Sequence, residues 1–411
     1  MNYRSFGKLK WAASALGFGC MRLPINGNNN EIDRPLSMKM IRYAIDHGVN
    51  YIDTAYTYQQ GKSEVLIGEA LKDGYREKVK IATKMPNSLI HSQQDMDKYL
   101  DKQIQRLRTN YIDFYLLHSL NKNRWRELRQ LDVSAWLERK MDRGVIKHVG
   151  FSFHDDFETF KKVVDSYSGW AFCQILYNYM DADNQAGTRG IEYAASKGLG
   201  VVVMEPLAGG KLAIAPKEIK SIWETAEVEK TPSEWALRWV WNQSQISVVL
   251  SGMSTLNQVA ENIEIANQSK SPNMSENELA LVKRVKEKYK ELGFINCTNC
   301  GYCMPCPKGI NIPAILSLYH DYQMMGKPKN FIDQYLDHIN PRSQARRCIG
   351  CGRCEDLCPQ KIAVRSILSE AELVFELGFR NITYYPKWGL RLMRNKLKKL
   401  NQVKRKNQYE D

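Results

Sequence analysis

Eight short apolar runs recur between residues 14 and 252, and stretches with helical periodicity alternate with them. The runs are rich in β-branched and aromatic residues, which favour strands. They lie at 14–21, 49–53, 79–84, 112–118, 146–152, 170–176, 199–205 and 246–252. The helix-like segments include 38–48, 63–74, 96–107, 157–167, 190–198, 232–242 and 256–267. Eight successive strand–helix units predict an α/β fold, a (β/α)8 TIM barrel with parallel strands inside and helices outside.

A doubly wound open sheet is the alternative arrangement of the same pattern. That fold carries a G-x-G-x-x-G turn after its first strand, and no such motif follows residues 14–21. Gly48, Gly144 and Gly198 end helix-like segments, where a left-handed C-terminal cap favours glycine. The alternation therefore favours the closed barrel.

The chain divides into four expected parts. They are a barrel at 1–270, a linker and helix at 271–294, a small and mostly helical ferredoxin-like domain at 295–370 and a basic helical tail at 371–411. Within the linker, Ser275 and Glu278 form the S-x-x-E pattern of a capping box that opens a helix.

The net charge of +14 is concentrated near the end of the sequence. Residues 387–411 hold nine Lys or Arg and two acids, which accounts for half of it. A solvated helical tail is the simpler interpretation; a weak docking surface for an acidic redox partner or an anionic lipid is the alternative. No base-reading module is visible, so we expect no nucleic-acid partner. No apolar run could span a membrane and no secretory signal is visible, so we expect a cytoplasmic protein.

Eight of the ten cysteines fall into two tight runs, CTNCGYCMPCP at 297–307 and CIGCGRCEDLCP at 348–359. Disulfides are rare in the cytosol, so this clustering indicates metal ligation. The second run has the C-x2-C-x2-C-x3-C-P spacing of bacterial 4Fe–4S ferredoxins. The first run is one residue shorter before its last cysteine. Zinc is the competing metal, but zinc ribbons use separated C-x2-C pairs and give a third adjacent cysteine no role.

The resemblance to two-cluster ferredoxins implies a ligand set for two 4Fe–4S clusters. In those proteins the fourth cysteine of each run binds the cluster of the other run. One cluster would then be held by Cys297, Cys300, Cys303 and Cys358, and the other by Cys348, Cys351, Cys354 and Cys306. Gly301, Gly350 and Gly352 would let backbone amides approach the sulfides.

Four polar side chains follow adjacent barrel strands, at the end where TIM barrels place their chemistry. They are Asp53, Tyr58, Lys84 and His118. A tyrosine titrates near 10, and we expect the Lys84 ammonium to lower the pKa of Tyr58, with Asp53 holding Lys84 in place. Such a phenol could protonate a carbonyl oxygen while hydride reaches the carbon, with His118 hydrogen-bonding the oxygen.

With these residues in place, the barrel resembles the aldo-keto reductase family, whose catalytic tetrad is Asp, Tyr, Lys and His at these strand ends. The stretch NYIDTAYTYQQGKSE, at 50–64, is similar to the family's second-strand signature. The resemblance covers about residues 1–270. It implies a nicotinamide cofactor, NADP or NAD, and a small carbonyl-type substrate.

The resemblance also implies cofactor-binding positions. They are Gly19, Cys20, Met21, Ser152, Gln174, Met204, Pro206, Leu207, Gly252, Met253, Gln258, Glu261 and Asn262. Ser152 and Gln174 match carboxamide-binding positions, but Phe153 replaces the family's Asn and Met204 its stacking aromatic. At Gly252, Met253 and Gln258 no Lys or Arg is present to grip a 2′-phosphate, so the usual preference for NADP is not expected.

We therefore expect an oxidoreductase with a nicotinamide-linked barrel site and two 4Fe–4S clusters, in a cell that lives with little oxygen. Nicotinamide transfers two electrons and each cluster one, which leaves three hypotheses. A bound flavin or an unusual substrate bridges the two halves; or the clusters are structural or regulatory beside an ordinary carbonyl reductase. Alternatively, the barrel is catalytically quiet and the chain is an electron carrier for a redox partner.

Overall fold

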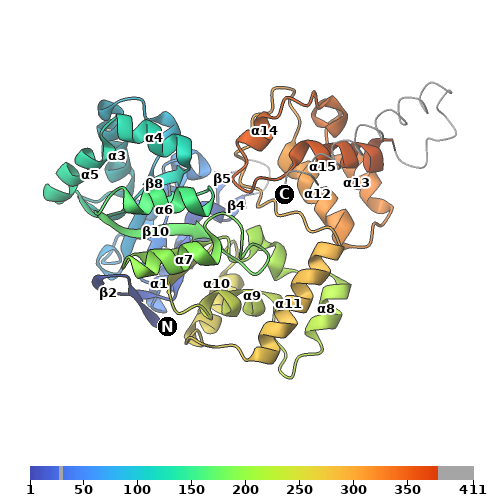
Figure 1. The fold of residues 1–411 in the computed structure, drawn as a ribbon, viewed down its shortest axis with the longest axis horizontal. Helices are drawn as coiled ribbons and strands as arrows, with labels where there is room; N and C mark the ends of the chain where they lie inside the picture. Colours follow the sequence, from blue (N-terminus) through green and yellow to red (C-terminus); the bar gives the residue numbers. More distant parts are fainter. Residues whose placement is uncertain (27–30, 378–411) are drawn as a thin grey trace. The chain divides into compact units, whose positions relative to one another are not determined.

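A sheet of eight parallel strands closes into a barrel in the first part of the chain (Figure 1). The computed structural model describes residues 1–26 and 31–377, and the barrel strands follow chain order around the ring. They are β3 (Leu16–Gly19), β6 (Tyr51–Asp53), β7 (Lys80–Met85), β8 (Ile112–Leu120), β9 (Ile146–Phe153), β10 (Trp170–Leu176), β11 (Gly200–Met204) and β12 (Ile246–Ser251). Each coincides with one of the eight apolar runs, so the predicted TIM barrel is confirmed.

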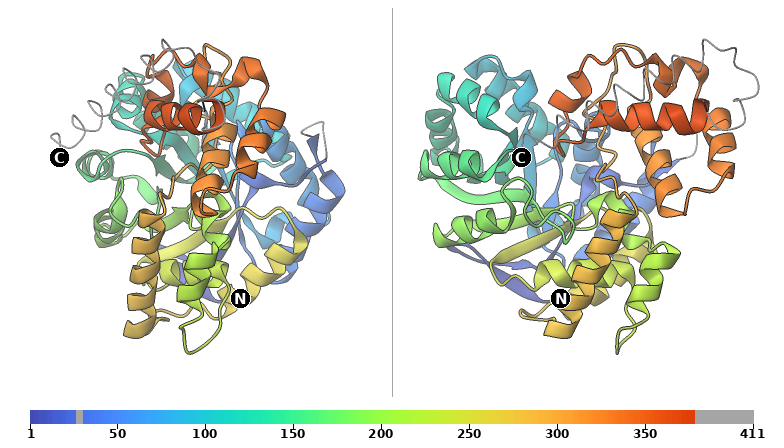
Figure 2. Two further views of the ribbon diagram at one scale, coloured as in Figure 1. Left: turned by 90° about the vertical axis from the view of Figure 1, so that its right-hand side faces the viewer. Right: turned by 45° about the vertical axis from the view of Figure 1, so that its right-hand side comes forward.

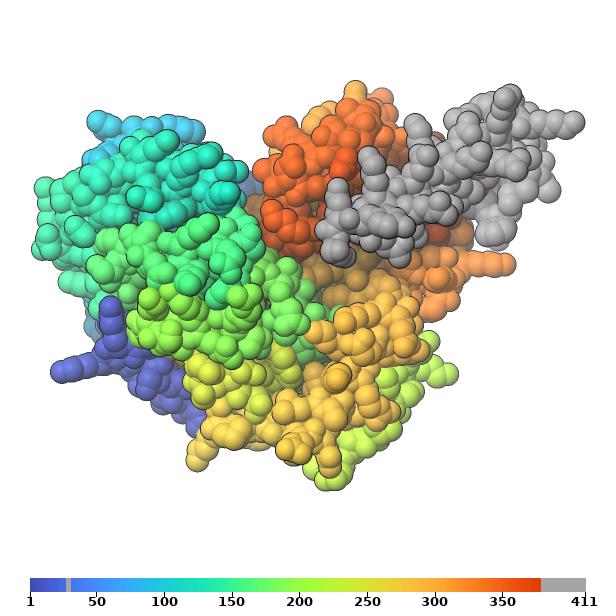
Figure 3. All heavy atoms as spheres, in the orientation of Figure 1, coloured from blue at the N-terminus to red at the C-terminus, as the bar shows by residue number. Residues whose placement is uncertain are grey.

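Helices surround the barrel, and in Figure 3 the side chains of the cyan-to-green segments form a continuous outer layer on one face. They are α1 (Arg34–Asp46), α2 (Lys62–Ala70), α3 (Gln93–Leu107), α4 (Lys122–Gln130), α5 (Val133–Asp142), α6 (Phe157–Asp165), α7 (Gly187–Ser196), α9 (Pro232–Trp241) and α10 (Leu256–Asn267). Helix α8 (Lys217–Trp223) has its first residues in the second of two compact units. Gly48, Gly144 and Gly198 follow helices with φ of 95°, 71° and 74°, as predicted for left-handed caps.

An antiparallel hairpin, β1 (Tyr3–Phe6) and β2 (Leu9–Ser14), precedes the barrel. Its turn residue Gly7 has φ of 53°, and a Cβ there would lie 2.4 Å from the backbone nitrogen of Gly200. Only glycine therefore lets the turn approach the start of β11. Phe6 is fully buried among the rings that fill the barrel interior, including Tyr51, Phe114 and Phe172. The hairpin thus closes the amino-terminal end of the barrel.

Arg4, on β1, ties this hairpin to the last part of the barrel. Its guanidinium donates hydrogen bonds to the backbone carbonyl oxygens of Trp241, Gln243, Ile246 and Ser269, at 2.6–3.0 Å. Partial burial lowers the pKa of Arg4 to about 10, and the group stays charged at neutral pH. One side chain therefore joins segments from the two ends of the barrel sequence.

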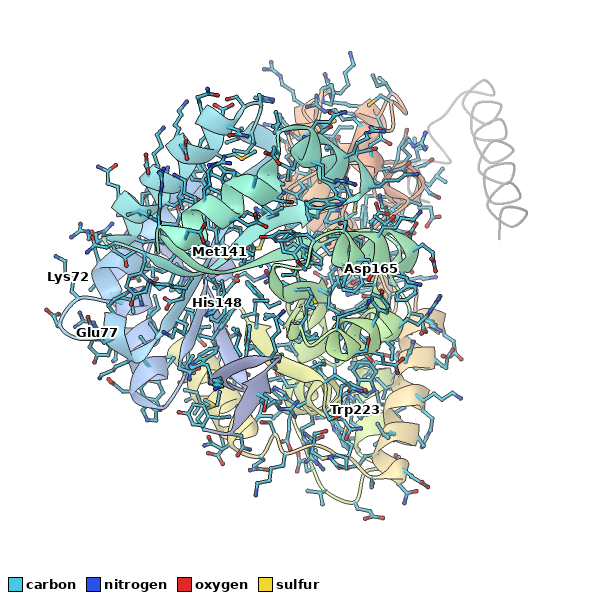
Figure 4. The ribbon with its side chains drawn as sticks, turned by 60° about the vertical axis from the view of Figure 1, so that its left-hand side comes forward. Lys72, Glu77, Met141, His148, Asp165 and Trp223 are labelled. Atoms are coloured by element: carbon cyan, nitrogen blue, oxygen red, sulfur yellow. The ribbon has the colours of Figure 1, made fainter. Side chains whose placement is uncertain are left out.

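A hollow beside the hairpin marks the amino-terminal end of the strands. Its lining includes Trp11, Lys80, Phe114 and His148, and the position of His148 near the start of β9 can be followed in Figure 4. The opposite end of the barrel carries the candidate active site. A short antiparallel pair, β4 (Ile25–Asn26) with β5 (Glu31–Ile32), lies in the connection between β3 and α1.

The chain forms two compact units. The first comprises Met1–Ala215 and Lys220–Lys286, and the second comprises Pro216–Ile219 and the chain from Glu287 onward. Helix α11 (Glu276–Glu291) begins in the first unit with the predicted capping box: Ser275 Oγ accepts from the Glu278 amide at 3.2 Å, and Glu278 Oε2 from the Ser275 amide at 2.8 Å. Within the described ranges, no helix has the length and apolar character needed to cross a membrane.

The second unit is mostly helical, as predicted. Its helices are α12 (Ile312–Met324), α13 (Asn330–His338), α14 (Arg353–Asp356), α15 (Val364–Ala371) and the π-helical segment Glu372–Glu376. Helix α12 packs against α13 and α15 around a core that includes Leu316, Tyr335 and Phe375 (Figure 2). The predicted basic tail falls largely at 378–411, which lies outside the described residues.

Candidate active site and metal centre

Three of the four predicted catalytic side chains form a chain of contacts at the carboxyl ends of β6 and β7. The ammonium of Lys84 lies 2.5 Å from Asp53 Oδ1 and donates to the carbonyl oxygen of Thr54 at 2.7 Å. It also donates to the hydroxyl of Tyr58 at 3.3 Å. Asp53 and Lys84 are 2% and 1% exposed, so water does not separate the charges. The neighbouring strands thus bring Asp53, Tyr58 and Lys84 into contact with one another.

His118, on β8, completes the predicted group. Its ring lies edge-on to Tyr58, with centroids 6.1 Å apart and planes at 77°. The next residue, Ser119, has φ of 53°, an uncommon conformation for a residue with a side chain. The Asn87 amide donates to the carbonyl oxygen of His118. The strand end that carries the imidazole is thus held from both sides.

The protonation states differ from the sequence-based expectation. Burial raises the pKa of Tyr58 well above its ordinary value, and the carboxylates of Asp53 and Glu205 raise it further. The prediction that Lys84 lowers the pKa of Tyr58 was wrong, because it neglected burial and the two acids. Burial also lowers the pKa of His118, helped by the charge of Lys84. Both rings are therefore neutral at neutral pH, and each can donate a hydrogen bond.

Asp53 experiences opposing effects. Burial raises its pKa, whereas Lys84 and the neighbouring Gln174 amide act to lower it. A buried carboxylate of this kind depends on its cation. The ion pair therefore fixes the position of the Lys84 ammonium beside the phenol.

The expected carboxamide-binding residues lie on adjacent strands. Gln174 on β10 is paired in register with Ser152 on β9. Ser152 Oγ accepts from the Ser119 amide at 2.7 Å, which leaves its hydroxyl hydrogen to donate elsewhere. Within the described part of the chain, Oε1 of Gln174 is buried without a hydrogen-bond partner. A buried, unpaired amide oxygen fits a carboxamide donor.

The residues at and after the end of β3 also lie near the tetrad. Gly19 approaches the last strand so closely that a Cβ would lie 3.1 Å from the carbonyl oxygen of Ser251. Cys20 is fully buried, and its thiol interacts electrostatically with Asp53. The carbonyl oxygen of Met21 accepts from Gln59.

Sequence reasoning missed an ion pair at this end of the barrel. Arg22 Nη2 lies 3.8 Å from Glu205 Oε1, and Arg22 packs where a Cβ on Gly252 would be. Glu205 follows β11 directly before Pro206 and Leu207, and its backbone φ is 57°. Met204 ends β11 and Met253 is buried. Arg22 lies three residues past the end of β3 and Glu205 one residue past the end of β11, so the sequence shows both charges near strand ends but not their pairing.

Three of the expected cofactor-binding residues after β12 make contacts within the barrel. Gln258 Oε1 accepts from the Ser254 amide at 2.8 Å at the start of α10. Glu261 accepts from the Thr231 hydroxyl at 2.8 Å, and Asn262 donates to Ser251 Oγ at 2.8 Å. These contacts order the loop after β12. Their role toward a nucleotide stays a prediction.

The eight clustered cysteines line two hollows in the second unit. The first hollow is lined by Cys297, Cys300, Cys303 and Cys358. The second hollow is lined by Cys306, Cys348, Cys351 and Cys354, and also by Cys303. In both, the fourth cysteine of one run lies with three cysteines of the other. This grouping matches the expected ligand sets.

The backbone around both runs repeats one conformation. Asn299 and Gly301 have φ of 54° and 78°, and the equivalent Gly350 and Gly352 have φ of 71° and 80°. A Cβ on Gly301 or Gly350 would meet no atom within 4 Å, so conformation and not space favours glycine there. Left-handed residues at alternate positions are a feature of backbone nests, whose amides bind anionic groups such as iron–sulfur clusters.

The spread of the thiols bears on the choice of metal. In residues 1–26 and 31–377, no group of three or more His, Cys, Asp or Glu converges on the position of a single metal ion. A zinc ion needs all its sulfurs about 2.3 Å from one point. Each cysteine of a 4Fe–4S cube binds a different iron, so thiols spread around a hollow fit the cube better.

Comparisons with known proteins agree with this geometry. The model of the aldo/keto reductase family matches residues 15–284, and that of the 4Fe-4S dicluster domain matches residues 296–363. A probable aldo-keto reductase 1 of Glycine max is 26% identical over 292 residues, 62% of this chain and 82% of that protein. L-galactose dehydrogenase of Arabidopsis thaliana is 26% identical over 308 residues, 70% of this chain and 95% of that protein.

A solved structure shares the barrel fold. The holo form of the aldo-keto reductase AKR11C1 from Bacillus halodurans superposes with a TM-score of 0.58 at 24% identity, covering 69% of this chain and 96% of that one. Aldo-keto reductases generally use NAD(P)H. The chain is therefore an oxidoreductase that belongs to the aldo/keto reductase family and carries a 4Fe-4S dicluster domain after its barrel.

Proposed function

We propose that the barrel catalyses nicotinamide-linked hydride transfer to or from a small carbonyl-type substrate, and that two 4Fe–4S clusters exchange electrons with a redox partner. The observation that carries the barrel's role is the contact chain from Asp53 through Lys84 to the hydroxyl of Tyr58. Such a chain places a proton donor beside a buried cation, as carbonyl reduction requires.

Each side chain has a defined task. A bound nicotinamide would supply the hydride for the new C–H bond. Tyr58 gives its hydroxyl proton to the carbonyl oxygen, and the Lys84 ammonium, 3.3 Å away, stabilises the phenolate that remains. Asp53 keeps Lys84 in place. Neutral His118 donates a hydrogen bond that orients the carbonyl.

Ser152 and Gln174 would hold the carboxamide of the nicotinamide. The Ser152 hydroxyl can donate and the unpaired Gln174 Oε1 can accept, so together they complement an amide. Gly252, Met253 and Gln258, at the positions expected near the 2′-phosphate, carry no positive charge and therefore favour NAD over NADP. Assays with both NADH and NADPH test this preference.

Replacing Tyr58 with Phe tests the acid. Tyr58→Phe removes the donated proton and leaves the ring, so we expect carbonyl reduction to fall about 100- to 10,000-fold. Tyr56→Phe makes the same chemical change two residues away and should retain activity. Nicotinamide binding, followed by fluorescence, should be similar in both variants. Equal turnover by Tyr58→Phe and the parent chain would contradict the proposed role.

Anaerobic purification with iron and sulfide analysis tests the clusters. Two cubes predict about eight irons and eight sulfides per chain. A colourless protein loaded with zinc would overturn the cysteine assignment. The same preparation should be analysed for flavin, which would convert two-electron to one-electron transfer.

The grouping of the cysteines favours a second candidate function, in which the chain is mainly an electron carrier. Addition of NADH or NADPH under anaerobic conditions separates the two. If the clusters develop an EPR signal with nicotinamide alone, hydride oxidation feeds them. If they stay oxidised until dithionite is added, the barrel and the clusters work separately.

A further inference from the structure

The two cysteine hollows differ in how far their thiols reach the surface. Cys348 and Cys351, which line the second hollow, are exposed. The cysteines of the first hollow are each only partly exposed. One-electron transfer between proteins requires close approach of the two redox centres. The second hollow is therefore the better place for such an approach.

The hollows also differ in charge. The second hollow is lined by Lys308, Arg353 and Arg365, whereas the described lining of the first hollow holds no charged side chain apart from its thiols. Arg365 is paired with Glu355 at 2.6 Å, and Asp356 is exposed nearby in the sequence. Lys308 and Arg353 leave the lining with an excess of positive charge.

This excess extends beyond the lining. Residues 342–365 contain six Lys or Arg and two acids, whereas residues 297–316 contain one basic residue and no acid. Arg347 is exposed and donates to the carbonyl oxygen of Lys308, so it belongs to the same surface. Arg346 is also exposed, although Glu376 lies 3.6 Å from it. Basic residues therefore line the hollow of the exposed thiols and precede and follow them in the sequence.

An apolar centre accompanies the charge. Ile349 and Leu357 are 62% and 45% exposed, and each is the direct neighbour of a cysteine, Cys348 and Cys358. A single exposed apolar side chain needs no explanation. Ile349 lines the second hollow, and Leu357 follows α14, where its amide donates to the carbonyl oxygen of Arg353 at 3.2 Å. Exposed apolar side chains next to basic ones have the composition of a transient protein interface, with an apolar centre and a charged rim.

We propose that this surface, formed by Lys308, Arg347, Ile349, Arg353 and Leu357, is the docking site of a small acidic one-electron carrier protein. The inference rests on the proposed function of the cysteine region as a two-cluster electron carrier. Carboxylates around the partner's redox centre would pair with the basic rim and speed association. A lipid surface has anionic charge but offers no redox centre to the exposed thiols.

The same charges make the two clusters unequal. Reduction adds one negative charge to a cube, and nearby cations and solvent stabilise that charge. The cluster of the second hollow should therefore have the higher reduction potential. An electron arriving from the partner would therefore reside mainly on that cluster.

The test uses the full chain with its clusters and a purified acidic flavodoxin reduced to the hydroquinone. Mixing them anaerobically transfers one electron, leaving the flavodoxin semiquinone and one reduced cluster. We expect Arg347→Glu/Arg353→Glu to slow this step at least tenfold at low ionic strength, and high salt to remove the difference. Lys327→Glu/Lys329→Glu changes the charge equally at exposed positions of the same unit and should react within twofold of the parent chain.

A redox titration followed by EPR gives the second readout. Arg353→Glu should shift one cluster signal to a lower potential and leave the other unchanged, with iron content unaltered. Unchanged flavodoxin kinetics, equal slowing by the control pair, or equal shifts of both signals would overturn the proposal. Loss of binding to phosphatidylserine vesicles by Arg347→Glu/Arg353→Glu, with unchanged flavodoxin kinetics, would also overturn it. That result would assign the surface to lipid. Carbonyl reduction, assayed separately, tests the barrel and is independent of these results.

Discussion

Three charged neighbours act on the phenol of Tyr58, and their effects differ. Lys84 donates to it, but burial and the carboxylates of Asp53 and Glu205 keep its pKa high. The phenol is therefore fully protonated at neutral pH. The Lys84 ammonium exerts its main effect when the proton leaves and a phenolate forms. Lys84 then works on the transition state more than on the resting enzyme.

This protonation state predicts the pH dependence of the reaction. The raised pKa of Tyr58 keeps the phenol protonated, and the lowered pKa of His118 keeps the imidazole neutral. We therefore expect kcat/KM for carbonyl reduction to stay within about twofold from about pH 6.5 to 9. Alcohol oxidation needs the phenolate and should become faster as pH rises over the same range.

A series of kcat/KM measurements with one ketone and one buffer system checks this. An alkaline decline in reduction with a midpoint near pH 8 would show that Lys84 lowers the pKa of Tyr58, as the sequence had suggested.

At this scale the sequence predicted the residue types and their meeting place, because strand ends converge at one end of a barrel. Asp53, Tyr58 and Lys84 lie as expected. The direction of the pKa shift of Tyr58 was not predictable, since it depends on burial and on Glu205, which a strand-by-strand reading does not bring near. The Arg22–Glu205 pair was missed for the same reason.

At the scale of elements, the buried carboxylate of Glu64 joins α2, α3 and β7. It accepts from Thr83 at 2.7 Å and Gln103 at 2.8 Å, and it pairs with Arg106 at 3.1 Å. Gln103 also donates to the carbonyl oxygen of Lys84 at 3.0 Å. Helix packing behind the strand thus helps to position the catalytic lysine.

Removing this carboxylate should destabilise the barrel. Glu64→Ala leaves buried donors without an acceptor, and we expect a loss of about 3 kcal/mol in the free energy of unfolding. Glu69→Ala on the same helix removes ion pairs to Arg34 and Arg108, which are about half exposed, and should cost about 1 kcal/mol or less.

Urea unfolding followed by tryptophan fluorescence measures both variants. The signal reports mainly the barrel unit, because eight of the nine tryptophans of the sequence lie between residues 11 and 241 and only Trp388 lies beyond it. Equal losses in the two variants would contradict the special role of Glu64.

Other elements show which parts of the fold the apolar pattern of the sequence predicts and which it does not. The eight barrel strands were predictable because buried parallel strands are continuously apolar. Helix α4 was not, because only Trp125 and Leu128 of its nine residues are buried and the apolar stripe is too narrow. The hairpin of β1 and β2 was missed because its strands are short and exposed residues alternate with part-buried or buried ones, so no continuous apolar run marks them.

On the scale of the whole molecule, the chain combines two kinds of order. The barrel is held by a large apolar core. The cysteine region has a smaller core, and three of the thiols pack against it, Cys297, Cys303 and Cys306. Small domains often depend on metal for folding. We therefore expect the clusters to stabilise the second unit directly.

Exchange of ligands between the two runs has a distinct signature. Cys306 belongs to the first run by sequence but lines the second hollow with Cys348, Cys351 and Cys354. We expect Cys306→Ser and Cys351→Ser to lose the same cluster, about four of about eight irons, and to leave the same EPR spectrum. Cys300→Ser, in the same run as Cys306, should leave the other spectrum. A match between Cys306→Ser and Cys300→Ser would show that each run binds its own cluster.

The contacts of Arg4 bear on the order of events during translation. Its guanidinium donates hydrogen bonds to the carbonyl oxygens of Trp241 and Ser269. These residues follow Arg4 in the sequence by 237 and 265 positions. The ribosome must therefore release nearly the whole barrel before the hairpin can dock. Until then the bottom of the nascent barrel stays uncapped, and a chaperone would find its aromatic interior exposed there.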